Sequence, residues 1–460
     1  MKADSCASTM DRPLVIVIGA GPAGLFAAQH LASQGVRVAL LNRDIRPGGL
    51  AEYGIYYDKY RVKETLRQQF RKILASPDVS YYGNVTVGQD GDVTLAELRD
   101  MGAQAIVVAV GAQGTKWLGL PGEDLRGVYH AKDIIYHYNR LPPYSQQPYA
   151  IGRRVAVIGV GNVMADIAHW LVRDVKVDEV IAVARRGPAE VKFTRQEMEY
   201  IAHNLDVAAF NAEIDRVAAR VWAVNQDPEA ARAFILSAIS DRAAPATSQT
   251  RLHFRFLSSP RRILGDDASQ VKGLEVDDTE LILKPDGDTK AQRLGTTHVL
   301  DVDTVIFCIG DRVSETFGLP VAWGEFVKSP QPAFEGAECS YEAYDPQTGQ
   351  PIEGVFIVGW AREASKGQVA LARKDAQTGV AALMAYLNSR PASGDADAVE
   401  ARLNARLQQS GKPIVTREGW ERLERVEQEE GQRRGVTAFK FASNVEMLAA
   451  IEGKIATDLA

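Results

Sequence analysis

The sequence predicts an α/β protein with two Rossmann-like domains, the second inserted into the first, and a small C-terminal extension. Two observations carry this prediction: glycine-rich strand–turn–helix units at residues 14–31 and 154–171. A third observation supports it: the apolar segment at 353–360 predicts a buried strand that returns the chain to the first domain. At 460 residues the chain is too long for one ordinary core, so two or three domains are expected.

Composition and charge exclude several classes of protein. The chain is 46% hydrophobic and 24% charged with a net charge of −6, so no global basic field favours nucleic acid or a membrane surface. Its three cysteines, Cys6, Cys308 and Cys339, lie far apart, which excludes a disulfide scaffold, a CxxC dithiol and a four-cysteine iron–sulfur cluster. Neither a signal-type segment nor a membrane-spanning run is present, so we expect a cytoplasmic protein.

The first glycine unit reads LVIVIGAGPAGLFAAQHL at 14–31. Gly19 permits a tight turn, Gly21 lets the backbone approach a pyrophosphate, and Gly24 lets the helix lie close to the strand. Glycines also end strands and open turns in other settings. A strand before them and a helix-prone stretch after them favour a dinucleotide site.

The next strand is predicted at 36–41 (VRVALL). A carboxylate at the end of such a strand usually holds the adenosine ribose. Here the position falls on Asn42, which can hydrogen-bond a hydroxyl but carries no charge. The turn at 47–49 then brings the backbone close to a flat group or to another loop.

A helix predicted from Lys63 onward carries several cations. Lys63, Arg67 and Arg71 share one face at i, i+4 and i+8. Two interpretations stay open for them: an ordinary solvated face, or, together with Lys59 and Arg61, a docking patch for an acidic protein.

The second glycine unit follows a buried strand at 105–111 and a Pro- and Gly-rich crossover at 112–124, which marks a domain boundary. Its strand is predicted at 155–158, with glycines at 159 and 161. Met164 occupies the third glycine position, so this fingerprint is imperfect.

Two arginines distinguish the second unit. Arg185 and Arg186 follow the strand at 180–183, where a ribose carboxylate would otherwise lie. Their forked, charge-assisted hydrogen bonds are suited to clamp a 2′-phosphate, which favours NADP over NAD. The alternative is a surface arginine pair. We therefore expect FAD at the first unit and NADP(H) at the second.

The remaining chain completes both domains. The stretch at 250–310 is rich in short strands, and a helix over 367–387 offers its positive N-terminus to a bound ring. Residues 388–411 are polar and predict a loose connection, and a small helical and mixed appendix follows.

Other prominent side chains have ordinary explanations. No metal site is predicted, because metal-ligand spacing is absent among His130, His137 and His169. Cys308, inside VIFCIG, is expected in the core. Either packing or stacking against flavin or nicotinamide explains the cluster of Tyr56, Tyr57 and Tyr60.

Taken in order, these blocks resemble the adrenodoxin reductase-like ferredoxin–NADP+ reductases, which are glutathione-reductase-type flavoproteins with two dinucleotide-binding domains. The resemblance covers nearly the whole chain. Its blocks are GAGPAGL (19–25), PGGLAEYGI (47–55), LPGEDLRGV (120–128), GVGNVMADIAHWL (159–171), ARRGPAEVKFTRQE (184–197), RLHFRFLSSPRRILGDD (251–267), DTVIFCIG (303–310), VGW (358–360) and KDAQTGV (374–380).

The resemblance implies a discontinuous FAD domain (12–112 and 315–390), an inserted NADP domain (113–314) and a C-terminal extension (391–460) packing on the FAD domain. The implied FAD contacts are Gly19, Gly21, Pro22, Ala23, Gly24, Asn42, Arg43, Gly48, Gly49, Leu50, Gly111, Gly359, Trp360, Gln368 and Val369. The implied NADP(H) contacts are Gly159, Gly161, Asn162, Val163, Arg185, Arg186 and Glu197.

The implied reaction passes hydride between NADP(H) and flavin N5 and then single electrons to a ferredoxin or flavodoxin. Around the reacting ring the resemblance places Lys59, Glu197, Tyr200, Trp360 and Gly367. This chain departs from the family pattern there. Lys59 replaces a usual histidine, Tyr200 replaces a carboxylate, and residues 363–367 read EASKG in place of RGPTG.

Two alternatives remain beside a ferredoxin reductase. One is the flavin subunit of a multi-component reductase, although that group usually adds a cysteine-rich N-terminal module. The other is a non-catalytic FAD-binding scaffold. A flavin monooxygenase is disfavoured, because no matching signature lies between the two nucleotide units.

Overall fold

The computed structural model describes residues 12–333, 339–364, 369–390 and 395–454. Two compact units emerge from the contacts of the chain. Unit 1 contains the residues up to 114, residues 138–146 and the residues from 310 onward, and unit 2 contains residues 115–137 and 147–309. Residues 138–146 lie within the range predicted for the inserted domain (113–314). Their contacts lie with unit 1, where Asn139 accepts a hydrogen bond from Lys63.

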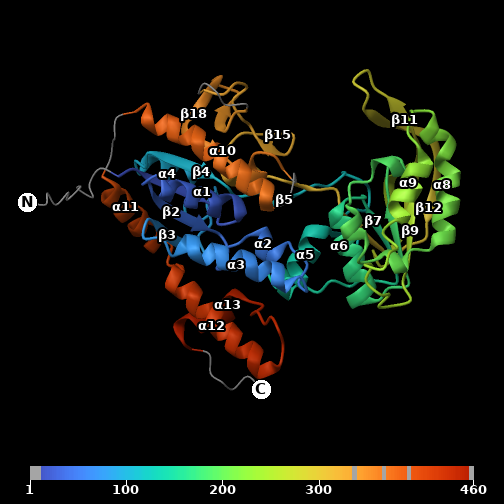
Figure 1. Ribbon diagram of the computed structural model, residues 1–460, viewed down its shortest axis with the longest axis horizontal. Helices are drawn as coiled ribbons and strands as arrows, with labels where there is room; N and C mark the ends of the chain where they lie inside the picture. The colour runs from blue at the N-terminus through green and yellow to red at the C-terminus, as the bar shows by residue number, and fades with distance from the viewer. Residues whose placement is uncertain (1–11, 334–338, 365–368, 391–394, 455–460) are drawn as a thin grey trace, which may run out of the picture. The chain divides into compact units, whose positions relative to one another are not determined.

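Unit 1 is built on a six-stranded sheet in the order β17-β18-β4-β1-β2-β3, which is parallel except for the edge strand β17 (Figure 1). Its strands are β1 (Leu14–Ile18), β2 (Arg37–Asn42), β3 (Val79–Gly83), β4 (Ala105–Val108), β17 (Glu342–Asp345) and β18 (Gln350–Ile357).

Helices cover both faces of this sheet, so every residue of β1 is buried. Val15 and Val17 face a core shared with α1 (Pro22–Ser33), α3 (Tyr60–Leu74) and α10 (Val369–Asn388). The alternate residues of β1 face a second core, shared with α4 (Leu95–Asp100) and α11 (Ala396–Gln408). Figure 1 shows α1 and α10 side by side over the sheet.

Unit 2 contains a five-stranded parallel sheet in the order β6-β13-β7-β8-β9. Its strands are β6 (Val128–His130), β7 (Arg154–Ile158), β8 (Glu179–Val183), β9 (Arg251–Arg255) and β13 (Thr304–Phe307). A separate three-stranded antiparallel sheet comprises β10 (Ser258–Gly265), β11 (Val271–Leu283) and β12 (Thr289–Leu300). The two parallel sheets confirm the predicted α/β class.

The remaining elements are shorter or peripheral. They are α2 (Leu50–Tyr53), α5 (Ala131–Tyr138), α6 (Asn162–Trp170), α7 (Arg195–Met198), α8 (Val207–Trp222), α9 (Pro228–Leu236), β5 (Gly114–Thr115), β14 (Asp311–Arg312), β15 (Val321–Ala322), β16 (Glu325–Phe326), the π-turn η3 (Leu171–Val175) and the 3₁₀ turn η7 (Gly359–Ala361).

One predicted loop proves to be a helix. Residues 388–411 were expected to form a loose connection, yet α11 runs through them. Asp395 caps its N-terminus, and Val399, Leu403 and Leu407 bury one face at i, i+4 and i+8. The abundance of alanine and charged residues hides this narrow apolar stripe. Cys308 also departs from expectation, because β13 ends one residue earlier and leaves it only half-buried.

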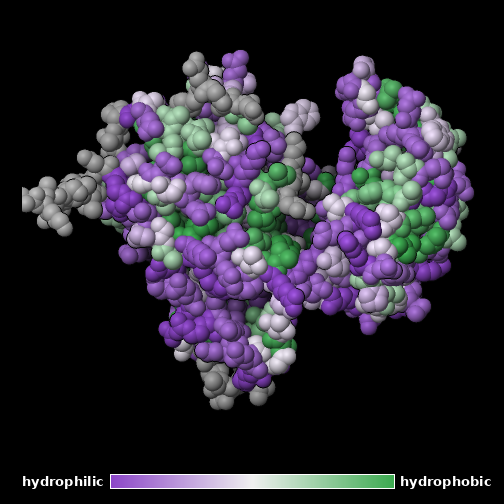
Figure 2. Space-filling model, in the orientation of Figure 1, coloured by the Kyte–Doolittle hydropathy of each residue, from purple (hydrophilic) through white to green (hydrophobic). Residues whose placement is uncertain are grey.

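The C-terminal extension belongs to the core of unit 1. Helix α12 (Arg417–Arg434) and helix α13 (Asn444–Glu452) contribute Trp420, Leu423 and Met447 to the cluster that contains Val15 and Val17. The visible outer face over α12 is mainly hydrophilic (Figure 2). Across the described ranges, no helix is long and apolar enough to cross a membrane.

The closest packing in unit 1 lies at the first glycine turn. A Cβ at Gly24 would come within 1.8 Å of the Gly19 carbonyl oxygen, whereas a Cβ at Gly21 would lie 4.0 Å from the Gly49 Cα, an ordinary contact distance. Gly24 is therefore required by packing. Gly21 is not.

We predict that Gly24→Ala lowers the free energy of unfolding by about 1–3 kcal/mol or more, because α1 must move away from the turn. Gly21→Ala should change it much less, since its φ of −75° suits any residue. Denaturant unfolding of both ligand-free variants checks this. Equal losses would show that both glycines serve the fold alone.

Candidate functional site

The first glycine turn lies at a topological switch point of the unit 1 sheet. β1 pairs with β2 on one side and with β4 on the other, and a crevice outside the carboxyl ends of such strands is where open α/β sheets bind ligands. Gly21 is the N-cap of α1, whose first turn carries neither an acidic residue nor a side-chain cap. The positive helix end and open space beside Gly21 fit an anionic group.

The second block, around Gly48 and Gly49, rests directly on this turn. The Gly48 N–H donates to the Ala20 carbonyl (2.7 Å), and a Cβ at Gly49 would lie 2.9 Å from the Gly21 Cα. Both glycines have positive φ, +114° and +48°, which side chains disfavour. Leu50 then begins α2.

The third block reaches the same turn from the end of the chain. A Cβ at Gly359 would lie 2.5 Å from the Ala23 Cβ, and the Gly359 N–H donates to Asp375 Oδ2 (2.6 Å). Trp360 follows in η7, half-buried, and Val369 begins α10. Gly367 and Gln368 lie outside the described residues.

Asn42, predicted to lie beside the adenosine ribose, makes hydrogen bonds within the chain. Its side chain is buried, with Oδ1 accepting from the Ala20 N–H (3.1 Å) and Nδ2 donating to the Asp44 and Arg46 carbonyls (2.7 and 2.9 Å). The amide thereby holds the glycine turn to the end of β2. The neighbouring Arg43 reaches Gln113 (3.2 Å), two residues beyond Gly111, which has a positive φ.

Lys59 is the N-cap of α3 and follows Tyr56 and Tyr57 in the chain. Tyr56 is fully buried and packs against Tyr57 and Tyr138, with ring centroids 4.8 and 5.2 Å away. For Tyr56 this agrees with the packing interpretation. Tyr60, in contrast, is exposed.

The predicted basic face of α3 is not an open docking patch. Lys63 is 4% exposed and donates to Asn139 Oδ1 and to the Glu52 carbonyl (2.5 and 3.0 Å). Arg67 makes two hydrogen bonds to the Glu52 carboxylate (2.7 and 2.6 Å). Arg71 pairs with Glu424 of the C-terminal extension. The three residues do share one face of α3, as their i, i+4 spacing predicts, but this face packs against other parts of unit 1.

Burial changes the charge of Lys63. Removal from water, reinforced by the neighbouring Lys440 ammonium, lowers the pKa of Lys63 to about 6, although Glu52 and Asp58 oppose the shift. At neutral pH its amine is therefore largely uncharged. A lysine in a solvated docking patch would carry a positive charge at this pH.

Unit 2 repeats the glycine-turn geometry. Gly159 has a φ of +121°, and Gly161 is the N-cap of α6, whose first turn also lacks acidic residues and a side-chain cap. Asn162 Oδ1 accepts from the Thr194 N–H (2.8 Å), while Val163 is exposed. Met164, at the third glycine position, is fully buried. The open N-terminus of α6 fits a second anionic group.

The two arginines after β8 differ in their surroundings. Arg186 already pairs with Glu190 (2.7 Å) and lies 3.6 Å from Asp288. Arg185 is exposed, and no acidic side chain within the described ranges pairs with it. Arg185 is thus the freer cation.

Tyr200 packs inside unit 2. Its ring stacks on that of the buried His169, with centroids 5.2 Å apart, while Glu197 lies half-buried in α7. His130 is also buried and accepts a hydrogen bond from the Lys132 N–H (3.2 Å). In the part of the chain that the structure describes, no group of three or more His, Cys, Asp or Glu residues could hold a metal.

With this geometry established, comparison with known proteins identifies the family. Residues 13–328 match the model for pyridine nucleotide-disulphide oxidoreductases. The chain belongs to this family.

Relatives within the family share nearly its whole length. The chain is 30% identical to the NADPH-ferredoxin reductase FprA of Mycobacterium tuberculosis, covering 95% of this chain and 99% of that one. It is 27% identical to the mitochondrial NADPH:adrenodoxin oxidoreductase of Arabidopsis thaliana, with 96% of each covered. The solved structure of M. tuberculosis FprA in complex with NADPH matches with a TM-score of 0.78 at 28% identity, over 96% of this chain and 100% of that one. The resemblance drawn from the sequence blocks is confirmed.

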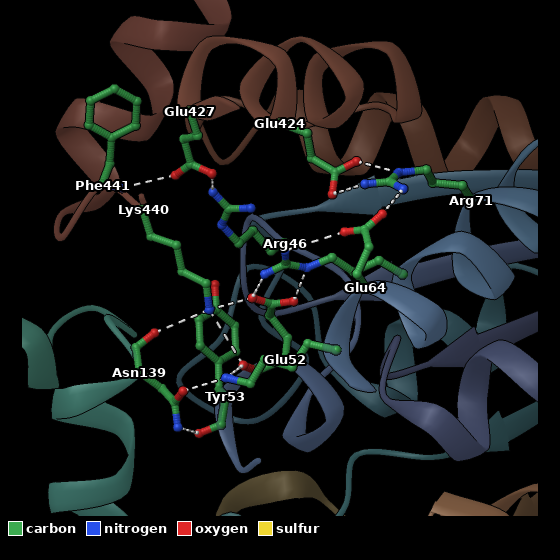
Figure 3. Close-up of polar contacts among 12 residues, drawn as sticks. Arg46, Glu52, Tyr53, Glu64, Arg71, Asn139, Glu424, Glu427, Lys440 and Phe441 are labelled. Atoms are coloured by element: carbon green, nitrogen blue, oxygen red, sulfur yellow. Dashed lines mark hydrogen bonds and ion pairs between the residues drawn. The ribbon is translucent and has the colours of Figure 1, made fainter. Parts of the chain in front are cut away.

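A buried charge cluster beside residues 47–49, called the diglycine turn below, could not be predicted from the sequence. It unites Arg46 and Glu52 with Glu427 and Lys440, almost 400 residues later (Figure 3). The only local indication of this cluster is Glu52, a charged residue within the PGGLAEYGI block, whose neighbours were expected to lie near a ligand. Nothing in the sequence indicates its distant partners.

The buried Lys63 predicts a pH dependence of stability. Between pH 6 and 8 the unfolded chain binds a proton at this lysine that the folded chain lacks, so stability rises with pH and falls toward pH 6. This one group contributes a slope of about 1.4 kcal/mol per pH unit at most.

Lys63→Met should remove that part of the slope, measured as the free energy of unfolding in denaturant at pH 6, 7 and 8. Lys72→Met, at an exposed position of the same helix, serves as the matched control and should retain the wild-type slope. A wild-type slope in Lys63→Met would show that Lys63 is charged in the folded protein.

Proposed function

We propose that this protein is an FAD-dependent NADPH–ferredoxin oxidoreductase. The observation that carries the proposal is the pair of open helix N-termini at glycine turns, one in each parallel sheet. Two such turns suit two dinucleotides. The names of relatives that align over nearly the whole chain support NADPH and ferredoxin as the reactants.

In this proposal unit 1 holds FAD. The pyrophosphate lies at Gly21 and the N-terminus of α1, and the isoalloxazine lies among the segments that start at Gly49 and Gly359. The close backbone packing of these three segments supports one shared ligand. Bound FAD supplies the ability to exchange a hydride with NADP(H) and single electrons with an iron–sulfur protein. The chain's own task is to bind and orient it.

Unit 2 holds NADP(H) in the same proposal. Gly161 and the N-terminus of α6 receive the pyrophosphate, and Arg185 binds the 2′-phosphate. Arg186 contributes less, because Glu190 already neutralises it. Glu197 stays a candidate beside the cofactor.

The partner proposed is an iron–sulfur protein of the ferredoxin type, with flavodoxin as an alternative acceptor. Of the five cations first assigned to partner docking, Arg61 is exposed and Lys59 half-buried, so these two remain candidates. The scarcity of cysteines, with neither Cys308 nor Cys339 in a disulfide, is compatible with the proposed cytoplasmic location.

Anaerobic reduction tests the function directly. We expect NADPH to bleach the visible flavin band of the purified protein, and subsequently added oxidised ferredoxin to become reduced as the band returns. Absence of bleaching would contradict every reductase assignment and favour a scaffold. Bleaching without transfer to any ferredoxin would point to another acceptor.

Cofactor selectivity should depend on one arginine more than the other. Arg185→Ala removes charge-assisted hydrogen bonds of about 1.5–3 kcal/mol, so we expect roughly a 10- to 100-fold higher KM for NADPH and little change for NADH. Arg186→Ala should have a smaller effect.

The measurement is steady-state kinetics with both nucleotides. Arg153→Ala serves as the control, because this exposed arginine pairs with Asp178 at the opposite end of β8. Equal losses with NADPH and NADH in Arg185→Ala would rule out a 2′-phosphate contact.

A further inference from the structure

The C-terminal extension contacts the diglycine turn (residues 47–49) through buried charges on both sides of it. Before the turn, the Arg46 guanidinium pairs with the Glu427 carboxylate of α12, and their side chains are 4% and 5% exposed. These residues come from opposite ends of the chain, as the close-up shows (Figure 3). The first contact therefore links the approach to the turn with α12.

After the turn, Lys440 makes the second contact. Its ammonium, in the connection between α12 and α13, pairs with the Glu52 carboxylate and lies 5.0 Å from the centre of the Tyr53 ring. Arg67 holds the same carboxylate from α3. Lys440 also approaches the Glu52 and Asn139 carbonyl oxygens at 3.4 Å.

The two contacts form one continuous network. The Phe441 N–H, next to Lys440, donates to Glu427 Oε1 (2.9 Å). Glu427 thus fixes Arg46 with its carboxylate and also fixes the backbone that carries Lys440 (Figure 3). The attractions of Lys440 and Arg67 keep the pKa of Glu52 well below its usual range despite burial, so its carboxylate stays charged.

Backbone hydrogen bonds, such as the one from the Gly48 N–H to the Ala20 carbonyl, hold the turn, but its two glycines add no side-chain contact of their own. Gly48 and Gly49 have positive φ values, and glycine can adopt many other backbone conformations almost as easily. Burying four charges in two pairs is rarely the most stabilising choice for a core, but it can fix one arrangement among alternatives. Here the arrangement fixed is the one that places Gly49 on Gly21.

We propose that the C-terminal extension is a clamp that holds the diglycine turn in its FAD-binding conformation through the Arg46–Glu427 and Glu52–Lys440 pairs. This rests on the proposed function, since it assumes that the turn contacts FAD. In this role Glu427 and Lys440 are positioning residues. They act on the cofactor through the turn.

The test compares the FAD dissociation constants of two clamp variants and the wild-type protein. Glu427→Gln keeps an acceptor for the Phe441 N–H but removes the charge that pairs with Arg46, and Lys440→Met keeps chain length without the ammonium. We expect each to raise the FAD dissociation constant at least tenfold and to change the visible circular dichroism of the bound flavin. Lys440→Arg, which retains the charge, should restore both.

Glu400→Gln is the matched control. Glu400 is another partly buried acid of the C-terminal extension, and it pairs with Arg37, but it reaches β2 and β3 and makes no contact with the turn. Glu400→Gln should leave the FAD dissociation constant within twofold of the wild-type value. NADP+ affinity, measured by titration calorimetry, should be unchanged in all four variants because its proposed site lies in unit 2.

The outcomes separate the clamp from the function. Folded clamp variants that bind FAD with the wild-type dissociation constant would overturn the clamp, whether or not NADPH bleaches the flavin. Equal losses in Glu400→Gln and the clamp variants would also overturn it, showing a general loss of stability. A wild-type protein that binds no FAD would instead overturn the proposed function.

Discussion

Three backbone segments meet at one point in unit 1, and the candidate site depends on how closely they approach. The diglycine turn and the segment at Gly359 each contact the turn at Gly19–Gly24 where a Cβ would intrude. Such contacts are possible only because Gly49 and Gly359 have no side chains, so the site is assembled largely from main chain. Main-chain amides and a helix end then face the space where a dinucleotide would lie.

Main chain alone does not hold such a site in place, and unit 1 uses charge and amide side chains for this purpose. Asn42 ties the first turn to the end of β2, and Asp375 ties Gly359 to α10. The diglycine turn is tied to the C-terminal extension by ion pairs that are almost wholly buried. Breaking a buried pair typically costs about 3–5 kcal/mol, because one charge remains in the core without a partner. The extension is thereby integral to unit 1.

Much of the fold could be predicted because its signals are local. The strands β1, β2, β7 and β8 lie within a residue or two of the predicted positions, since parallel strands are continuous apolar runs bounded by glycine. Helix α11 was missed because its apolar stripe is narrow within a polar segment. The stretch at 250–310 was expected to hold short strands, yet it contains the long β11, whose pattern is interrupted by a register irregularity between Asp277 and Thr279.

The sequence by itself determined the two glycine units, their order and the arginines after β8, because these depend on residues within one turn or strand. Only the tertiary structure decided which polar side chains remain available. The cations of α3 have the spacing of an exposed face, yet Lys63 is buried and Arg67 is bound to Glu52. Asn42 has the position of a ribose ligand, yet its amide is engaged within the chain. Spacing fixes which residues share a face, whereas the elements that pack against that face come from distant sequence, here from α12 and the residues around Lys440.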